Sequence, residues 1–549
     1  MSTTAYFNDD TQKYLVEGLN LVANAVKATL GPAGNTVIIQ REDKTPLITK
    51  DGVSVAKEIH PKDERVKLGA DLAISVAQKQ MGNCGDGTST STVLAQALVN
   101  AGIRQISFSD SALNRTSVRR GIEKARDYVI HRLDDMSKKI ETDDELVHIA
   151  TVSANGDEKL GGVVAEAYKK VGKNGVVLVE ETKNRDITLD FKEGMTFNKG
   201  WTSQFFITNH EDQSVEFEDA RLLLCESKIS NFATLAQLIQ QLANSGKPLV
   251  IIAESYDNAV IQALAMNIVR SKGQLKIACV EAPGYGQRRL DILRDIATYT
   301  GATVADDPMG IKLEGMTVAD FGVCDKIIIK KDETVIRGGK GDADLLKDRI
   351  NSIEGLIKAT KENDNFEREQ LNKRLAALTT GIAVIQVGGS SEEEIKELKD
   401  RLDDAQWAVK AALEEGYVPG SGNTLLHLSE ELKIALAGDN YAERIGIEIF
   451  THALKAPIKT ILENAGQPSE VIINELVKCA DVKKGFNAKT LEYTDLLEAG
   501  IIDPKKVVAG AVYAASSIAS VVLTSSVMIT QDPIENSGVN FNMMPPGMI

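Results

Sequence analysis

Helical periodicity governs both ends of the chain, and short apolar runs govern its centre. Near the start, four apolar residues recur at helical spacing: Leu15, Leu19, Val22 and Val26. This pattern stops at a Gly-Pro-Ala-Gly turn over residues 31–34, after which a short strand is predicted over 36–40. A second turn follows at 49–52, and helical periodicity then dominates to about residue 138.

The central region predicts an α/β fold. Runs of β-branched residues bounded by glycine, proline or charge predict strands over 176–180, 248–254, 276–281, 326–330 and 382–387. Several of these runs are continuously apolar, which is typical of buried parallel strands. Helical stretches at 234–244 and 258–269 lie between them, and such alternation indicates an α/β domain.

Helical pattern returns after the centre. Residues 342–378 are highly charged and helical, with a break near 363–365. Ser391 and Glu394 predict a capping box ahead of an amphipathic helix, and the chain to about residue 527 is again mainly helical. The end of the chain, NSGVNFNMMPPGMI, reads as a flexible tail. We therefore predict a multidomain α/β protein in which both chain ends form a helical body around an α/β insert.

Composition narrows the class of protein. At 549 residues, two to four domains are expected. The net charge of −15 argues against nucleic acid or an anionic membrane as the main partner. The five cysteines are far apart and form no CxxC pair, which predicts reduced thiols. The six histidines never fall at metal-ligand spacing. No targeting signal is evident, and no apolar run approaches a membrane span, so we expect a soluble cytoplasmic protein.

The sharpest chemical motif is the run from Gly85 to Thr92, GDGTSTST, which leads into a predicted helix. Its two glycines allow close approach of an anion, the following amides form a helix N-terminus that attracts phosphate, and Asp86 offers the oxygen that Mg²⁺ prefers. The run is not a Walker A motif, because it lacks Gly-Lys-Ser/Thr. Taken alone, it is better explained as a capped helix after a tight turn.

Two further turns strengthen the phosphate interpretation. Together the three motifs resemble the group I chaperonins, the GroEL family, in order and spacing: TLGPAG at 29–34, TKDGVSVAKEI at 49–59 and GDGTSTSTVLAQAL at 85–98. The resemblance continues nearly to the end of the chain through VSANGDE at 152–158, EAPGYGQRR at 281–289, DDAQWAVKAALEEGYVPGSG at 403–422 and GIIDPKKV at 500–507. It implies an ATP-dependent chaperone that captures non-native polypeptide clients and promotes their folding inside the cavity of a homo-oligomeric ring, a heptamer in this family.

The resemblance also implies a nucleotide site. The expected ATP-binding residues are Thr29, Leu30, Gly31, Pro32, Lys50, Asp86, Gly87, Thr88, Ser89, Thr90, Ser421, Gly422, Asn487, Ala488, Lys489, Ile501 and Asp503. Asp86 would hold Mg²⁺, and the carbonyls of Thr29 and Lys50 with the Ser89 hydroxyl would hold K⁺. Ser89 stands where the family usually has threonine, and Ser421 lies in a GSG run where the family usually has GGG.

The resemblance assigns the catalytic role to two aspartates. Asp404 would orient the water that attacks the γ-phosphate, and Asp51 would help to position the same water. Asp403 is adjacent to Asp404 but projects about 100° away around the helix, so we expect it to be solvated. A lone helical aspartate is ordinarily a surface residue, and only the long flanking match favours the catalytic role.

The family's domain plan implies three domains and a tail. Their expected bounds are 1–135 and 415–531 for the equatorial ATP-binding domain, 136–192 and 383–414 for the intermediate hinge, 193–382 for the apical domain, and 532–549 for the tail. Asp404 lies on the returning hinge segment, so hinge closure would carry it onto the nucleotide. Clients would bind an exposed apolar groove formed by Trp201, Phe205, Phe206, Phe232, Leu235, Ile239, Ile261, Ala265 and Met266. The alternative is that these apolar stripes are core.

The chain departs from the family at several positions. Ala236 and Ala265 replace larger aliphatic residues in the client groove, which leaves open the client range and whether a lid co-chaperonin is a partner. Gln467 and Pro468 replace the acids that would pair with a basic residue near Lys459 between rings, so single rings are a live hypothesis. The competing functions are a metabolic ATP-dependent transferase and a structural ring without hydrolysis. A group II chaperonin is disfavoured by the 281–289 segment and by the absence of an inserted apical protrusion.

Overall fold

The chain divides into two compact units, each described separately below. The computed structural model describes residues 3–40, 46–107, 113–172, 175–182, 185–192, 194–210, 212–243, 246–272, 274–360, 365–379, 381–436, 438–479 and 481–531. Unit 1 comprises Met1–Ala165 and Gly388–Ile549, and unit 2 comprises Glu166–Val387. Both crossings between units fall inside the segments expected to form the hinge; the three-domain division stays a prediction. The predicted tail, 532–549, lies outside the described residues.

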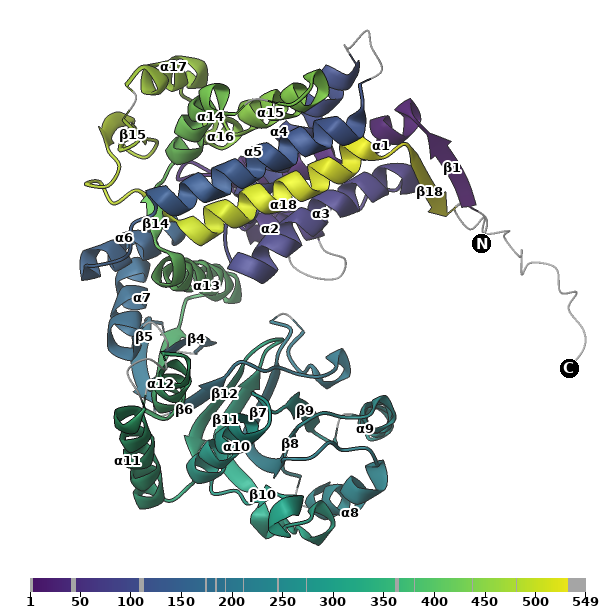
Figure 1. Ribbon diagram of the computed structural model, residues 1–549, viewed down its shortest axis with the longest axis vertical. Helices are drawn as coiled ribbons and strands as arrows, with labels where there is room; N and C mark the ends of the chain where they lie inside the picture. Colours follow the sequence, from purple (N-terminus) through teal and green to yellow (C-terminus); the bar gives the residue numbers. More distant parts are fainter. Residues whose placement is uncertain are drawn as a thin grey trace, which may run out of the picture. The chain divides into compact units, whose positions relative to one another are not determined.

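Unit 1 is built mainly from helices that come from both ends of the chain (Figure 1). The N-terminal part contributes α1 (Asp9–Val26), α2 (Gly52–Lys57), α3 (Glu64–Cys84), α4 (Thr88–Ser107), α5 (Arg115–Met136), α6 (Asp143–Ser153) and the start of α7 (Glu158–Val171). The C-terminal part contributes α13 (Glu392–Glu415), α14 (Asn423–Ala435), α15 (Tyr441–Ala453), α16 (Ala456–Asn464), α17 (Ser469–Cys479) and α18 (Lys505–Thr524). This arrangement confirms the predicted helical body.

Two close approaches define the core of unit 1. The helix α18 packs on α3, α4 and α5, and α1 packs on α3. Gly18 and Gly69 permit the second contact, because a Cβ at Gly18 would lie 1.9 Å from the Val66 carbonyl oxygen and one at Gly69 2.2 Å from that of Leu15. Loss of either glycine would push these helices apart.

The helix α18 corrects one expectation from the sequence. Within the described residues it alone is long and apolar enough to cross a membrane, with a mean hydropathy of 1.9 over its most apolar window. The prediction that no apolar run approaches that length was therefore wrong. However, 67% of that window is buried inside unit 1, and a helix that is apolar on nearly every side is typical of a protein core.

Unit 1 also contains four small antiparallel sheets, two of which join distant parts of the chain. They pair β1 (Thr3–Phe7) with β18 (Val527–Gln531), β2 (Val37–Ile39) with β3 (Leu47–Thr49), β14 (Tyr417–Pro419) with β17 (Ile502–Pro504), and β15 (Lys484–Asn487) with β16 (Glu492–Asp495). The β14–β17 pair matters for the site described below, because it sets residues near 420 beside residues near 502.

Unit 2 contains the predicted α/β insert. Its main sheet has the order β6-β12-β11-β7-β8-β9, with β10 also paired to β7. The strands are β6 (Gly194–Phe197), β7 (Val215–Cys225), β8 (Leu249–Ala253), β9 (Ile277–Glu281), β10 (Val304–Ala305), β11 (Gly322–Ile329) and β12 (Thr334–Gly339). The β7-β8-β9 part is parallel and the β11 and β12 strands are antiparallel, so the sheet is mixed.

Helices connect and flank the parallel strands of unit 2. They are α8 (Phe232–Ala243), α9 (Asn258–Arg270), α10 (Gln287–Thr300), α11 (Ala343–Ala359) and α12 (Asn365–Thr379). The last three are joined by a buried carboxylate: Arg349 Nε and Arg374 Nε donate to Asp295 at 2.6 and 2.7 Å. A second sheet, of order β4-β13-β5, is formed by β4 (Val176–Glu181), β5 (Thr188–Lys192) and β13 (Ile382–Val387).

The capping box predicted at Ser391 forms only in part. The Ser391 hydroxyl accepts a hydrogen bond from the Glu394 amide at 3.2 Å. The Glu394 carboxylate, however, accepts from the amide of Ser390 rather than from that of Ser391. The helix α13 is therefore capped at its first turn, with the return bond shifted by one residue.

Candidate functional site

A glycine turn between α3 and α4 forms the floor of a cavity in unit 1. Gly85 and Gly87 have φ values of 71° and 80°, which residues with a Cβ rarely adopt. Side chains there would also collide with their surroundings, since a Cβ at Gly85 would lie 2.2 Å from Trp407 and one at Gly87 2.6 Å from Val507. The turn delivers the N-terminus of α4, with its unpaired amides, to the cavity.

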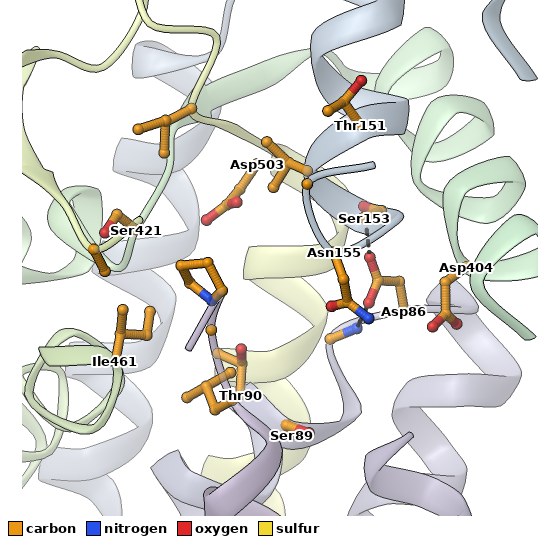
Figure 2. Close-up of a pocket in the computed structure, with 18 of the residues that line it drawn as sticks. Asp86, Ser89, Thr90, Thr151, Ser153, Asn155, Asp404, Ser421, Ile461 and Asp503 are labelled. Atoms are coloured by element: carbon orange, nitrogen blue, oxygen red, sulfur yellow. Dashed lines mark hydrogen bonds between the residues drawn. The ribbon is translucent and has the colours of Figure 1, made fainter. Parts of the chain in front are cut away.

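Asp86 lies between the two glycines and points into the cavity (Figure 2). Its carboxylate accepts hydrogen bonds from the Gly87 amide at 2.5 Å and from the Ser153 hydroxyl at 3.1 Å. Burial raises the pKa of Asp86, and these two hydrogen bonds partly offset the rise. The carboxylate is thus oriented by its neighbours, and a nearby cation would stabilise its ionised form in this buried position.

A second turn, over residues 29–34, forms another wall. The Thr29 hydroxyl donates to the Val26 carbonyl at 2.9 Å and lies 3.2 Å from the Ser89 hydroxyl. The side-chain amide of Asn464 on α16 donates to the carbonyls of Lys27 and Leu30 at 2.9 and 2.8 Å. This asparagine, which the sequence analysis missed, fixes the turn from a segment more than 400 residues away.

Asp51 is the N-cap of α2. Its carboxylate accepts hydrogen bonds from the amides of Val53 and Ser54 at 3.2 and 2.7 Å. Asp51 therefore has a structural role in addition to its place on the cavity wall. Both oxygens keep lone pairs that could still accept from a water molecule.

The helix α13 brings two carboxylates to the cavity, Asp404 and Asp400, one helical turn apart. Burial raises the pKa of Asp404 well above its usual value, and repulsion from Asp86 and Asp51 adds to the rise. Burial, with repulsion from Asp51, raises the pKa of Asp400 to about 7. Asp403 does not line the cavity, as expected, but it is half-buried rather than solvated.

The opposite end of the cavity is formed by the turn at 420–422, the β15–β16 hairpin and β17. Ser421 has a φ of 58°, and its hydroxyl donates to the Phe486 carbonyl at 3.3 Å. The Asn487 side chain accepts from the amides of Lys489 and Thr490, which fixes the hairpin loop. Burial, with repulsion from Asp86, raises the pKa of Asp503 to about 7.

Every residue expected in the ATP-binding and catalytic sets lines this one cavity of about 880 Å³. They come from seven separated stretches of the sequence: 29–32, 50–51, 86–90, 404, 421–422, 487–489 and 501–503. Figure 2 shows Asp86, Asp404, Asp503, Ser89, Thr90 and Ser421 around it. Their roles in binding or catalysis remain predictions, because position alone does not assign chemistry.

The cavity also has lining residues that the sequence analysis did not assign. They include His148, Thr151, Ser153 and Asn155 of α6 and the loop after it, Asp400 and Arg401 of α13, and Ile461 of α16. Asp400 could have been found from the sequence, since it lies four residues before Asp404 and so shares its helix face. Ser153 and Asn155 belong to the VSANGDE run, which carried the resemblance but was given no role, whereas His148 and Thr151 lie before that run.

The donor atoms suit hard cations. Within the described residues, no group of three or more His, Cys, Asp or Glu side chains is arranged to hold a metal ion by itself. Mg²⁺ commonly takes only one or two carboxylates and completes its shell with water and phosphate oxygens, so Asp86 fits that ion. The hydroxyls of Thr29 and Ser89 lie 3.2 Å apart in the cavity that Lys50 also lines, and they fit a cation held by neutral oxygens.

The nine expected client-binding residues of unit 2 do not form one exposed surface. Four are buried, contrary to expectation: Phe206, Leu235, Ile239 and Ala265. Three are half-buried: Trp201, Phe232 and Ile261. Only Phe205 and Met266 are well exposed, at 70% and 53%. The physical reason is that α8 turns its apolar stripe onto the core of unit 2, where Leu235 and Ile239 pack with the sheet.

Comparisons with known proteins agree with this architecture. A sequence model described as the TCP-1/cpn60 chaperonin family matches residues 22–533. Among solved structures, this chain is similar to the chaperonin gp146 from the bacteriophage EL 2 (Pseudomonas aeruginosa), crystallised in the presence of ATP-BeFx. The TM-score is 0.70 at 22% sequence identity, and the match covers 96% of this chain and 99% of that chain. At this identity the structural match shows a shared fold.

Proposed function

This chain belongs to the TCP-1/cpn60 chaperonin family, whose members are ATP-dependent chaperones, and from that premise we propose that the cavity of unit 1 binds and hydrolyses ATP. The observation that carries the proposal is the convergence of seven separated stretches on one cavity whose floor is a phosphate-type glycine turn. The 281–289 segment favours a group I chaperonin.

Phosphate binding is assigned to the two turns. Thr88, Ser89 and Thr90 begin α4 and line the cavity, and the amides and hydroxyls of such a first turn would donate to phosphate oxygens. Asp86 would hold Mg²⁺, and the Thr29 and Lys50 carbonyls with the Ser89 hydroxyl would hold K⁺. When bound, these ions supply the positive charge that a triphosphate and the surrounding carboxylates require.

Water activation is assigned to Asp404, with Asp51 in support. Asp404 lies on the cavity wall beside Asp86, and it must be ionised to accept a hydrogen bond from the attacking water. Burial and repulsion from Asp86 and Asp51 raise the pKa of Asp404, so bound cations would favour its ionised form. The proposal includes coupling to movement of the 383–414 segment, which carries Asp404.

The nucleoside end is assigned to the opposite wall. Asp503 would accept hydrogen bonds from the ribose hydroxyls, and Asn487, Ala488 and Ile501 would surround the base. The Ser421–Gly422 backbone would contact the ribose. Ser421 adopts a positive φ, a conformation that the glycine expected at this position would adopt freely.

Client capture is assigned to unit 2, with a smaller surface than the sequence predicted. Phe205, Met266 and the neighbouring Val269 are exposed at 70%, 53% and 68%, and Trp201 is half-buried. A methionine in an exposed apolar surface adapts to clients of different shape. The buried Leu235 and Ile239 of α8 and Ala265 of α9 would support these two helices, and the buried Phe206 would support the 3-10 turn that carries Phe205.

Ring assembly and partners form the last part of the proposal. A heptameric ring and a lid co-chaperonin follow the family's pattern, and the client is a non-native polypeptide. Lys459 Nζ lies 2.5 Å from the Glu470 carboxylate of its own chain, so its charge is already paired. This pairing, with Gln467 and Pro468 after Gly466, favours single rings in at least part of the cycle. Mass photometry with and without ATP tests this, and a double-ring mass in every state would exclude it.

The decisive experiment measures ATP turnover of the purified chain and of Asp404→Ala. We expect a loss of at least 100-fold in kcat, because the water would lose its orienting carboxylate. Assembly and capture of an unfolded client should be retained, since Asp404 lies on the cavity wall and not on the client surface.

The matched control is Asp403→Ala, the neighbouring carboxylate on the same helix that does not line the cavity. It should keep turnover within about threefold. Undiminished turnover in Asp404→Ala would remove that residue from catalysis. A wild-type chain that binds ATP without hydrolysing it would point to a structural ring, and turnover only with a small phosphate acceptor would point to a transferase.

A further inference from the structure

Gln80 is a buried polar residue next to the glycine turn that no motif singled out. It lies on α3 and is only 1% exposed. Its side-chain amide nitrogen donates to two main-chain carbonyls, that of Asp86 at 2.7 Å and that of Val507 at 3.1 Å. A long polar side chain that is buried this completely loses its hydration, and these two hydrogen bonds compensate for that loss at its amide nitrogen.

The bond to Asp86 acts on the peptide group that joins Asp86 to Gly87. Gln80 holds the carbonyl of this peptide, and the Asp86 carboxylate accepts from the amide of the same peptide at 2.5 Å. Both ends of one rigid planar group are therefore fixed. The orientation of the carboxylate is tied to the plane that Gln80 sets.

The flanking residues cannot fix that plane by themselves. Gly85 and Gly87 lie in the left-handed region, where glycine rotates with little steric penalty. Packing restricts this turn from outside, through Trp407 against Gly85 and Val507 against Gly87. The hydrogen bond from Gln80 adds a directional restraint on the Asp86 carbonyl that these two packing contacts do not supply directly.

We propose that Gln80 is a positioning residue that orients Asp86 toward the cation of the nucleotide site. This inference rests on the proposed function and deepens it, because it assigns the tuning of the Mg²⁺ ligand to a side chain on α3. It also accounts for the second bond of Gln80, to Val507, which ties the turn to the first turn of α18, the core helix of unit 1.

The test compares Gln80→Met with Gln78→Met in the full chain. Methionine keeps the length of the side chain and removes the donor. Gln78 lies on the same helix but is exposed, so its replacement is a matched control. Binding of a fluorescent ADP analogue is titrated over a range of Mg²⁺ concentrations, and kcat and KM for ATP are measured separately.

We expect the Mg²⁺ concentration for half-maximal ADP binding to rise about tenfold in Gln80→Met, with ADP binding in the absence of Mg²⁺ changed less than twofold. Amide hydrogen exchange of residues 85–88 should also quicken. Gln78→Met should match the wild type in all these measurements. If Gln80→Met does not fold, Gln80→Asn, whose amide is too short to reach Asp86, replaces it with the same expectation.

Two outcomes would overturn the assignment. One is an unchanged Mg²⁺ requirement in a folded Gln80 variant, and the other is an equal loss of ADP binding with and without Mg²⁺, which would indicate a purely structural role. A wild-type chain that binds no ADP at any Mg²⁺ concentration would instead contradict the proposed function itself. The two failures are therefore distinguishable.

Discussion

The nucleotide cavity of unit 1 and the client surface of unit 2 were both expected from the same resemblance, yet they fared differently against the structure. All the expected residues of the cavity line it, whereas four of the nine client residues are buried. The cavity is formed largely by turns, and the client surface is formed largely by helices. This difference in local structure explains the difference in outcome.

Turns place their residues through the main chain. Gly85 and Gly87 are required by positive φ values and close neighbours, so a substitution there changes the backbone itself. The pattern of an amphipathic helix identifies an apolar face, but it does not show whether that face packs on the core or lies at the surface. On α8, Leu235 and Ile239 belong to the buried side, while Phe232 lies half-buried at the start of the helix.

Gly85→Ala should produce the largest effect on the cavity. Its Cβ would lie 2.2 Å from the Trp407 ring of α13, so either the turn or α13 must move, and the positive φ of 71° adds about 1–2 kcal/mol of strain. We expect ATP turnover to fall at least 100-fold, measured by phosphate release at saturating Mg²⁺.

The control is Gly82→Ala, on α3, where a Cβ would meet no atom within 4 Å. This change should leave turnover intact and stabilise the chain by about 0.5–1 kcal/mol, because glycine is unfavourable inside a helix. Equal activity of the two variants would show that the backbone of the turn does not govern the cavity.

Leu235→Ser and Phe205→Ser should separate core from surface in unit 2. Leu235 is fully buried, so serine should lower the free energy of unfolding by roughly 3–5 kcal/mol through a cavity and a buried hydroxyl. Phe205 is 70% exposed, so its replacement should change stability by less than about 0.5 kcal/mol while weakening capture of an unfolded client. Urea unfolding measures the change in stability, and a client-binding assay measures capture. If Leu235→Ser instead weakened capture without loss of stability, the larger groove predicted from the sequence would be supported.

The sequence predicted the class of fold well because several buried strands are short, continuous apolar runs with clear ends. The runs at 248–254, 276–281 and 382–387 became β8, β9 and β13 within a residue at each end. The 11-residue strand β7 was missed, because Glu216, Glu218 and Asp219 interrupt its apolar pattern before the continuous run that ends at Cys225. Charged residues on the outer face of a mixed sheet obscure a strand in this way.

The residues that support the site were not predictable from local pattern. Asn464 and Gln80 act through hydrogen bonds to carbonyls that are distant in sequence or lie across a turn. Before the fold is known, each reads as an ordinary polar residue on a helix. Their roles arise only from the packing of α16 against the first turn and of α3 against α18, which is tertiary information.

The smallest expected effect concerns Asp400, which the resemblance did not assign. Its pKa is raised to about 7, whereas an unfolded aspartate titrates near 3.9. Between these values the folded chain binds more protons than the unfolded chain, so stability falls as pH rises through this window, and the full cost of the ionised group is present only above about pH 7.

Asp400→Asn should therefore raise the Tm of the nucleotide-free protein at pH 8 and leave it unchanged near pH 4. Because the side chain is only half-buried and water screens its charge, we expect a stabilisation of about 1–2 kcal/mol at pH 8. Each kcal/mol corresponds to a rise in Tm of roughly 2–4 °C. Scanning calorimetry at the two pH values, without divalent cations, makes the measurement. An equal shift in Tm at both pH values would mean that packing around residue 400, and not the charge of Asp400, causes the change. Repulsion among carboxylates would then not distinguish the cavity from the client surface.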